Sequence, residues 1–335
     1  MSRAVIATVV WIAVVGAGSA PTAAVGFSRT FDSLRIRFLS TQIAADASVR
    51  AEWGFGALVE ADEAKLLFDT GYLPDTVTTN AASLHVDLRG IHDVVLSHWH
   101  GDHTGGIETI LQAIGPGETR LRAHPAIFDA KFRRGAPDQQ ANTLRTRRAA
   151  IEAAHGTFRL SADPYEILPG MVVTGSIPRP RPKDQKLPDM FVLATGEIDS
   201  LPDEQALVVN TRDGLVVLTG CGHAGTVNTA AYVRSLFPNR PLVAVVGGFH
   251  WYASPEADVA EAGERLKDLG VQRLMGAHCT LVEPMFMLRQ HGWSREAAVV
   301  GAVGRDFFLH PTTPSSDGGR IVAANLPGET VCHTP

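Results

Sequence analysis

The sequence has few cysteines, which argues against a fold held together by disulfide bonds. Its 335 residues include only Cys221, Cys279 and Cys332. An odd number of widely separated cysteines is not the pattern of a disulfide framework. Cys221 and Cys279 each lie within two residues of a histidine, so a position near a metal ion is the more informative interpretation of these two.

An excess of positive charge is also absent. The 30 Lys and Arg residues stand against 35 Asp and Glu residues, and the formal net charge is −5. A chain that binds nucleic acid through bulk positive charge has the opposite balance, so we expect a small-molecule substrate and no nucleic acid. A local basic cluster exists at Lys131, Arg133, Arg134, Arg145, Arg147 and Arg148. Its simpler interpretation is a solvated helix face, and the alternative is a clamp for phosphate or carboxylate.

After the N-terminus, the sequence has no apolar run of the roughly 20 residues that a membrane-spanning helix needs. The first residues, MSRAVIATVVWIAVVGAGSAPTAAVG, contain a positive charge at Arg3, then an apolar stretch to about residue 15, then small residues. This layout is typical of a secretory signal peptide over residues 1–24, with cleavage after Ala20 or Ala24. We therefore expect an exported protein, periplasmic or secreted. An uncleaved anchor or a misassigned start codon are the alternatives.

Hydrophobic residues make up 45% of the chain, enough to bury a large core. Short apolar runs predict strands at 34–39, 55–60, 65–68, 93–96, 171–174, 206–210, 215–218, 242–246 and 273–275. Longer patterns predict helices at 106–114, 141–154, 226–236, 255–269 and 283–291. In the fourth helix we expect Ser254 as the N-cap and Pro255 at the first helical position. Paired strands followed by alternating strands and helices predict an α/β layered fold with mixed sheets.

The segment IPRPRPKDQKLPDM at 177–190 has four prolines and interleaved charges, so it cannot form a regular element. It is either a solvated connection or a loop that overhangs the functional site.

The stretch with the most chemical information is LSHWHGDHTGG at 96–106. Alternate residues of an extended segment face the same way, so His98 and His100 can reach one ion. Gly101 permits a sharp turn, after which Asp102 and His103 point back from the start of a helix and are placed for a second ion. Zinc accepts imidazole nitrogen and carboxylate oxygen at about 2.0–2.2 Å. A histidine-rich surface loop is the alternative, but these four side chains directly after an apolar strand favour a metal site.

This motif resembles the signature of the metallo-β-lactamase fold superfamily. LLFDTG (66–71) precedes it, and LVVLTGCGHAGTVNT (215–229), VVGGFH (245–250) and GAHCT (276–280) follow it in the family's order. Together with EWGFGALVE (52–60) and DEQALVV (203–209), they resemble the branch labelled 7,8-dihydropterin-6-yl-methyl-4-(β-D-ribofuranosyl)aminobenzene-5′-phosphate synthase. The resemblance implies a single domain over residues 30–335, an αββα sandwich of two mixed sheets flanked by helices. It also implies one or two divalent ions, zinc first and iron or manganese as alternatives.

The resemblance also implies the remaining site residues. His223 would complete the first ion's ligands with His98 and His100, and His278 would join Asp102 and His103 at the second ion. Asp69 would hydrogen-bond a ligating imidazole. His250 would be either a ligand or an acid that faces the substrate.

One departure from the family's pattern concerns the turn Thr219-Gly220-Cys221, where many members have an aspartate that bridges two ions. Cys221 could be a thiolate ligand, line the site, or be a small buried residue. Glu204 could approach the site and compensate. The departure leaves open whether both ions bind tightly.

These residues imply a metal-dependent hydrolase that attacks an ester- or phosphate-type bond of a small, anionic substrate. An ion held by His98, His100 and His223 would lower the pKa of its water from about 15.7 to about 7, while Asp102 would help to hold a second ion or orient the nucleophile. The alternatives are hydrolysis of another bond, a reaction like that of the synthase branch, and an exported metal- or ligand-binding protein without turnover.

Overall fold

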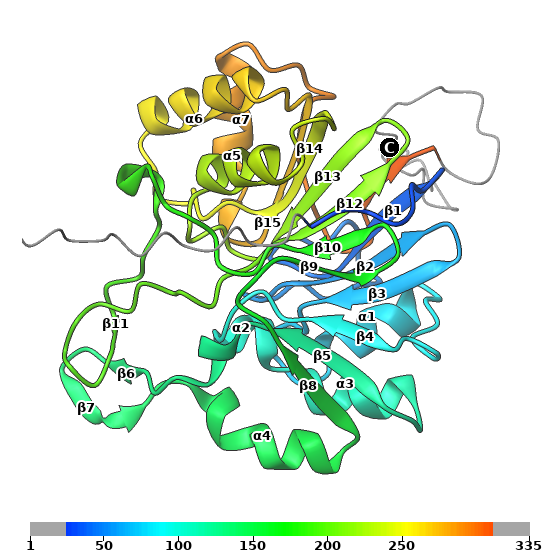
Figure 1. The fold of residues 1–335 in the computed structure, drawn as a ribbon, viewed down its shortest axis with the longest axis vertical. Helices are drawn as coiled ribbons and strands as arrows, with labels where there is room; N and C mark the ends of the chain where they lie inside the picture. The colour runs from blue at the N-terminus through cyan, green and yellow to red at the C-terminus, as the bar shows by residue number, and fades with distance from the viewer. Residues whose placement is uncertain (1–24, 311–335) are drawn as a thin grey trace, which may run out of the picture.

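Two mixed β-sheets form the centre of the molecule in the computed structural model, which describes residues 25–310 (Figure 1). The first sheet has the order β17-β1-β2-β3-β4-β5-β8. Its strands β1, β2 and β3 form an antiparallel meander, and β3, β4, β5 and β8 run parallel. The bounds are β1 (Leu34–Ser40), β2 (Gly56–Ala61), β3 (Ala64–Phe68), β4 (Asp93–Val95), β5 (Thr119–Ala123), β8 (Gly156–Leu160) and β17 (Asp306–Leu309).

The second sheet has the order β16-β15-β14-β13-β12-β10-β9. Here β9, β10, β12 and β13 pair antiparallel, whereas β13, β14, β15 and β16 are parallel. The bounds are β9 (Tyr165–Leu168), β10 (Met171–Val173), β12 (Leu207–Thr211), β13 (Gly214–Thr219), β14 (Leu242–Gly248), β15 (Arg273–Ala277) and β16 (Ala298–Val300). Both sheets are therefore mixed, as the sequence predicts.

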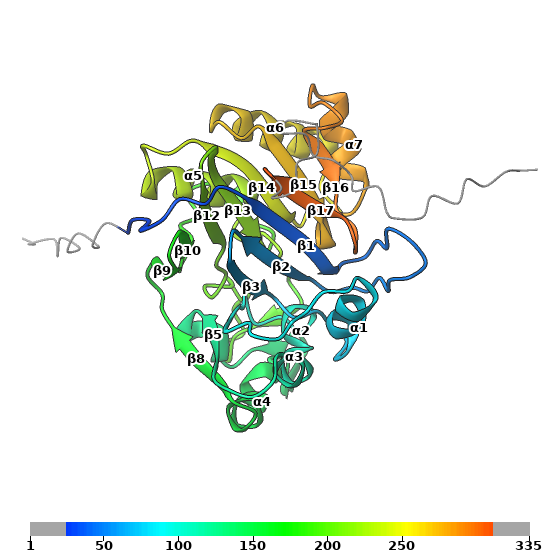
Figure 2. The same ribbon diagram turned by 90° about the vertical axis from the view of Figure 1, so that its right-hand side faces the viewer.

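The two sheets pack face to face through one apolar core. In β1, the alternate residues Leu34, Ile36 and Phe38 are buried there against residues of the second sheet such as Val216 and Met275. The outer face of the first sheet is covered by α1 (Thr76–Ser83), α3 (Ile107–Ile114) and α4 (Thr143–Ala153), and that of the second by α5 (Thr226–Leu236), α6 (Glu256–Asp268) and α7 (Glu283–Gln290) (Figures 1 and 2). The order of layers is helix, sheet, sheet, helix, which confirms the predicted αββα sandwich.

The start of α6 differs from the prediction. The N-cap residue is Pro255 and not Ser254, and no side chain accepts a hydrogen bond there. Pro255 has the extended dihedral angles φ −57° and ψ 147°, so the helical backbone begins one residue later. The acidic residues Glu256 and Asp258 lie in the first turn, where negative charge is favourable for the helix dipole.

Some elements have no strong signal in the sequence. The prediction missed α1, β5 and β8, and a small sheet of β6 (Phe132–Arg133), β7 (Ala136–Gln140) and β11 (Phe191–Val192). The polar residues of these elements hide the periodic pattern that identifies the core elements. β11 lies just after the segment 177–190, which contains the short 3-10 turn η2 (Pro182–Asp184) and is otherwise irregular.

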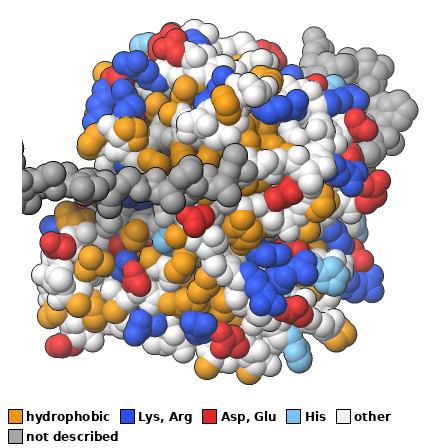
Figure 3. Space-filling model, viewed as in Figure 1, with side chains coloured by type: hydrophobic (Ala, Val, Ile, Leu, Met, Phe, Trp, Pro, Cys, Tyr) orange, Lys and Arg blue, Asp and Glu red, His pale blue; other side chains and the backbone are white. Residues whose placement is uncertain are grey.

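On the face shown in Figure 3, acidic, basic and apolar side chains are interspersed. Among residues 25–310, no helix has the length and apolar character required to cross a membrane. The predicted signal peptide at 1–24 and Cys332 lie outside the described residues.

Candidate metal centre

The histidine motif follows β4 and leads into the short helix α2 (Gly101–Thr104), for which His100 is the N-cap residue. His98 is fully buried and His100 nearly so. Their nitrogens Nε2 and Nδ1 lie 2.9 Å apart, so the extended segment does bring both rings to one point.

His223 reaches the same point from the loop after β13. Ligand atoms of His98, His100 and His223 all lie within 4.8 Å of one another. The Nδ1 of His223 donates to the backbone carbonyl of Lys186, which leaves its Nε2 facing the other two rings. Within residues 25–310, the Nε2 atoms of His100 and His223 are among the buried polar atoms that have no hydrogen-bond partner. A buried polar atom without a partner costs about 1–3 kcal/mol, and a bound cation would satisfy the one on His223. These residues therefore fit a divalent ion.

Asp102, His103 and His278 form a second set beside the first. The two Nε2 atoms of His103 and His278 lie 3.2 Å apart. The Oδ2 of Asp102 is 3.5 Å from His278 Nε2 and 3.9 Å from His103 Nε2. The structure thus brings together all six residues expected to hold metal.

Hydrogen bonds behind the rings fix how these histidines point. Asp69 Oδ2 accepts from His103 Nδ1 at 2.7 Å and from the Ser97 hydroxyl at 2.7 Å, and its Oδ1 accepts from the Ser97 amide. His98 Nδ1 lies 2.9 Å from the Ser97 hydroxyl oxygen. On the far side, the Gln42 amide contacts His278 Nδ1 at 3.1 Å. Asp69 and Ser97 together orient one ring from each set and direct both Nε2 atoms toward the centre.

Cys221 occupies the place where the family's pattern has an aspartate. Its sulfur is buried, lies 3.2 Å from His103 Nε2 and belongs to candidate groups with both sets. Gly220 lets the turn come this close, because a Cβ there would lie 2.1 Å from the Ser97 hydroxyl oxygen and 2.8 Å from Asp69 Oδ2. The geometry is that of a further donor to the ion set.

A cavity of about 460 Å³ opens above these residues. Its floor contains His100, Asp102, Cys221, His250 and His278. Its walls are largely aromatic or apolar and include Trp53, Tyr72, Pro188, Met190, Phe191 and Tyr252, with Arg133 as the one cationic side chain among the lining residues. Pro188 and Met190 come from the segment 177–190, so this segment overhangs the site and is not merely a solvated connection.

The sequence model of the metallo-β-lactamase superfamily matches residues 55–227, which contain the histidine motif, Cys221 and His223. The chain belongs to the metallo-β-lactamase superfamily. It is 30% identical over 269 residues to a 7,8-dihydropterin-6-methyl-4-(β-D-ribofuranosyl)-aminobenzene-5′-phosphate synthase of Methanocaldococcus jannaschii, which spans 76% of this chain and 91% of that protein.

Solved structures of the metallo-β-lactamase fold also match. The crystal structure of Tm1679, a metal-dependent hydrolase of the β-lactamase superfamily, has a TM-score of 0.66 at 26% identity and covers 83% of this chain and 100% of that one. Zn²⁺-bound PqqB of Methylobacterium extorquens has a TM-score of 0.51 at 16% identity, covering 82% of this chain and 100% of that one. At that identity, the PqqB match shows the fold alone.

Burial and charge prepare this metallo-β-lactamase-fold centre for a cation. Burial, with the neighbouring imidazoles, holds the pKa values of His98 and His223 well below 6.5, and burial lowers that of His100 to about 4. These rings are therefore neutral near pH 7, as metal ligands must be. Burial also opposes protonation of His103, but the carboxylates of Asp69 and Asp102 outweigh it and raise the pKa to about 9. The same negative charge favours a divalent ion, which must compete with that proton.

Three residues at this centre have a left-handed backbone conformation that is uncommon without glycine. Asp69, His250 and His278 have φ values of 58°, 51° and 49°. Such conformations cost on the order of 1–3 kcal/mol each and occur often at functional sites. In this superfamily member they place the three side chains at the ends of β3, β14 and β15.

Glu204 approaches the site, as expected, through contacts with backbone donors. Its Oε1 accepts from the His223 amide at 2.6 Å, and its Oε2 accepts from the Ala224 amide. Compensation for Cys221 by Glu204 stays a prediction. The position of Glu204 fixes the loop that presents His223.

His250 lies beside His223, with the ring centroids 4.4 Å apart, and lines the cavity. Burial alone would lower its pKa, but a hydrogen bond with Cys279 and the charge of Glu204 raise it above 6.5. A histidine that faces a cavity and has a raised pKa is suited to donate a proton.

The basic cluster separates into different roles. Lys131 is fully buried, which contradicts the predicted solvated position. Its burial is tolerated because its ammonium pairs with Asp199 at 2.8 Å. Asp199 also accepts from the Trp99 indole at 2.8 Å, and Asp203 accepts from the Trp99 amide at 2.7 Å. These buried groups anchor Trp99, which lies between His98 and His100 in the sequence. Of the six basic residues, Arg133 alone lines the cavity.

Cys279, which the sequence places near a metal ion, stands directly after His278, and its sulfur is 3.5 Å from that of Cys221. The sequence did not reveal Gln42, Ser97 or Lys186 as parts of the centre. Gln42 and Lys186 offered no signal, because they contact the histidines across 236 and 37 residues of chain.

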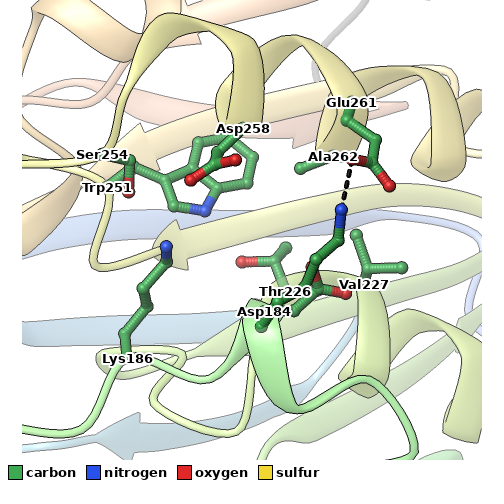
Figure 4. A pocket seen from close by; sticks show the side chains of 10 residues that line it. Asp184, Lys186, Thr226, Val227, Trp251, Ser254, Asp258, Glu261 and Ala262 are labelled. Carbon is green, nitrogen blue, oxygen red and sulfur yellow. Dashed lines mark hydrogen bonds and ion pairs between the residues drawn. The ribbon is translucent and has the colours of Figure 1, made fainter.

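Ion pairs join the segment 177–190 to α6. Arg181 pairs with Glu261 at 2.8 Å, and Lys183 also pairs with Glu261. Figure 4 shows Asp184 and Lys186 of this segment across a small cavity from Asp258 and Glu261 of α6. Since the Lys186 carbonyl holds His223, the segment links the cavity roof to a candidate ligand.

Proposed function

We propose that this protein is a metal-dependent hydrolase that cleaves an ester- or phosphate-type bond of a small anionic molecule. One observation carries the proposal: two sets of buried imidazole and carboxylate groups meet at the floor of a cavity, with His223 Nε2 directed at the centre and without a partner among residues 25–310. Zinc suits this donor set best, and iron or manganese are the alternatives.

The chain's residues divide the work. His98, His100 and His223 hold one divalent ion, and Asp102, His103 and His278 hold a second, with Cys221 as a further donor. A bound ion would lower the pKa of a water and polarise a substrate oxygen. Asp69 and Ser97 keep the ligating rings in place, and His250 donates a proton to the leaving group.

The cavity supports a particular class of substrate. Trp53, Tyr72 and Tyr252 are each about half exposed at its wall, so part of each ring is open to a ligand. Arg133 offers a guanidinium suited to phosphate or carboxylate. A planar or apolar group with an anionic end would satisfy both features.

Metal analysis joined to a substrate panel tests the proposal. Purified protein is assayed for zinc, iron and manganese and for chelator-sensitive hydrolysis of chromogenic phosphodiester, lactone, thioester and cephalosporin substrates. We expect His100→Ala and His103→Ala to abolish turnover and reduce metal content. His92→Ala, at an exposed histidine just before β4, is the matched control and retains both. Activity that survives both site substitutions would show the mechanism to be wrong.

A second candidate is a reaction like that of the Methanocaldococcus jannaschii synthase, which the 30% identity over 91% of that protein favours. Formation of the synthase product, with no hydrolysis across the panel, would support it.

Cys221 in place of the bridging aspartate favours a third candidate, an exported metal-binding protein without turnover. Stoichiometric metal with no chelator-sensitive activity would support that reading.

A further inference from the structure

Cys221 and Cys279 form a pair of thiols at the edge of the candidate metal centre. Their sulfurs lie 3.5 Å apart, although 58 residues separate them in the chain. Both are free cysteines and buried from bulk solvent, yet both line the cavity above the centre. Cys279 is fully buried and Cys221 nearly so, so a small solute in the cavity meets Cys221 first.

The backbone between them is built to let the sulfurs meet. Cys221 follows β13 and Cys279 follows β15, and β14 runs between these two strands. At its end, β14 has Gly248, where a Cβ would lie 2.1 Å from the Gly220 carbonyl oxygen and 3.0 Å from the Cys279 sulfur. A larger residue at position 248 would clash with the Gly220 carbonyl and crowd the Cys279 sulfur.

The sulfur of Cys221 belongs both to this thiol pair and to the candidate ion-binding groups. Cys221 Sγ lies 3.2 Å from His103 Nε2, and ligand atoms of Cys221, His278 and Cys279 lie within 4.8 Å of one another. A thiol sulfur can bind zinc as a thiolate, whereas a sulfur in a disulfide has no thiolate charge to donate. The oxidation state of this pair would therefore change the donor set of the second ion.

We propose that Cys221 and Cys279 form a reversible disulfide that weakens binding of the second ion. Hydrogen peroxide is the oxidant. One thiol attacks a peroxide oxygen, the O–O bond breaks, and one water leaves as a sulfenic acid forms. The second thiol attacks that sulfur, the S–S bond forms, and a second water leaves. The two sulfurs supply the two electrons that reduce the peroxide, and both thiol protons end in water. A disulfide needs about 2.05 Å between sulfurs, so side-chain rotation closes the remaining gap.

The effect on the metal rests on the proposed function, but formation of the disulfide does not. The test uses the full chain with Cys332→Ala, which removes the third cysteine. The protein as purified and the same protein after chelation are treated with hydrogen peroxide, then analysed by intact mass and peptide mapping. We expect a loss of two hydrogens, a linked peptide pair containing Cys221 and Cys279, and faster formation after chelation. Zinc affinity is measured by competition with a chromophoric chelator. At the site of the second ion it falls about 10-fold or more after oxidation and returns after reduction.

Cys279→Ser in the same background is the matched control. It retains Cys221 but cannot form the bond, so peroxide gives no linked peptides in this variant. Absence of the linked peptides, or oxidation only to sulfinic or sulfonic acid, overturns the disulfide. Linked protein that keeps the zinc affinity of the reduced form overturns the effect on the metal. If the reduced protein binds no zinc while the link forms, the proposed function fails together with the metal part, and the oxidation site stands.

Discussion

The direction of each histidine ring decides what the centre can bind. A neutral imidazole offers one lone pair, and the nitrogen that keeps the proton is chosen by its hydrogen-bond partner. Here the Lys186 carbonyl, Asp69 and the Ser97 hydroxyl meet Nδ1 of His223, His103 and His98. All three therefore direct Nε2 inward, so the orienting groups matter nearly as much as the ligands.

Asp69→Asn tests this control of ring direction. The amide keeps the shape of the carboxylate but can present its NH₂ group to His103, and it removes a buried negative charge beside the second ion set. We expect zinc affinity to fall about 10- to 100-fold in a folded protein, measured by chelator competition and circular dichroism. Asp87→Asn, at an exposed acid paired with Arg89, serves as the control and leaves affinity unchanged. An Asp69→Asn protein with wild-type zinc affinity would contradict the role of Asp69.

His250→Gln separates two roles for this residue. If His250 donates a proton, kcat falls by about 10²- to 10⁴-fold while KM and zinc content change little, because Gln cannot supply the proton but fills a similar space. Steady-state kinetics and elemental analysis on the same sample measure both effects. Zinc content that falls in parallel with kcat would identify His250 as a ligand and refute the proton-donor role.

At this scale, the sequence predicts a centre best where its parts are adjacent. Spacing alone was sufficient for His98, His100, Asp102 and His103, since local backbone geometry determines their directions. His223 and His278 required the resemblance to a family. The partners Gln42 and Lys186 could not be predicted, because they depend on tertiary contacts and, for Lys186, on a backbone atom that every residue has.

At the scale of elements, the segment 177–190 is held to α6 by exposed ion pairs on Glu261. Exposed pairs of this kind add little to stability. Glu261→Gln should therefore leave the melting temperature nearly unchanged but speed hydrogen–deuterium exchange over 181–190.

Glu264→Gln on the same helix is the control, because Glu264 pairs with Lys267 of α6 itself and leaves exchange in 181–190 unchanged. Equal exchange of this segment in both variants and the wild type would show that the ion pairs do not hold it.

The start of β4 has a stronger pairing. Asp93 is buried and accepts from Arg120 at 2.9 Å and from Arg122 at 2.7 Å, both in β5. Burial raises the pKa of Asp93, but the two guanidinium groups outweigh it and lower the value below its usual range. Because the folded-state pKa is depressed, this stability is present above the unfolded pKa of about 3.9 and is lost as pH falls through the folded value.

Asp93→Asn should therefore destabilise the protein by about 1–3 kcal/mol at pH 7 and remove part of the loss of stability below about pH 4. Denaturant unfolding at several pH values measures this. Parallel stability curves for the variant and the wild type across acid pH would contradict it.

The same polar residues explain why β5 was not predicted: Arg120 and Arg122 alternate with its buried residues but interrupt any apolar run.

At the scale of the whole molecule, the centre exists because two sheets meet. In the first sheet, β4 leads into the histidine motif. In the second sheet, Cys221 and His223 follow β13, His250 follows β14 and His278 follows β15. Alternating burial and strand order could be anticipated from the sequence. The distance between the sheets could not, because it depends on how the side chains of both inner faces pack. Ligands from both halves imply that an ion would join them.

Removal of metal should therefore lower the stability of the whole domain and not only its activity. An ion that binds the folded state alone adds about 2.7 kcal/mol when present at 100 times its dissociation constant, so chelation should lower the melting temperature by on the order of 5 °C. Calorimetry before chelation, after it and after zinc is restored measures the effect. His103→Ala provides the comparison, since a chain that has lost the second ion should respond less to chelation. A melting temperature unchanged by chelation, in protein that contained stoichiometric zinc, would show that the two halves are held together without the ion.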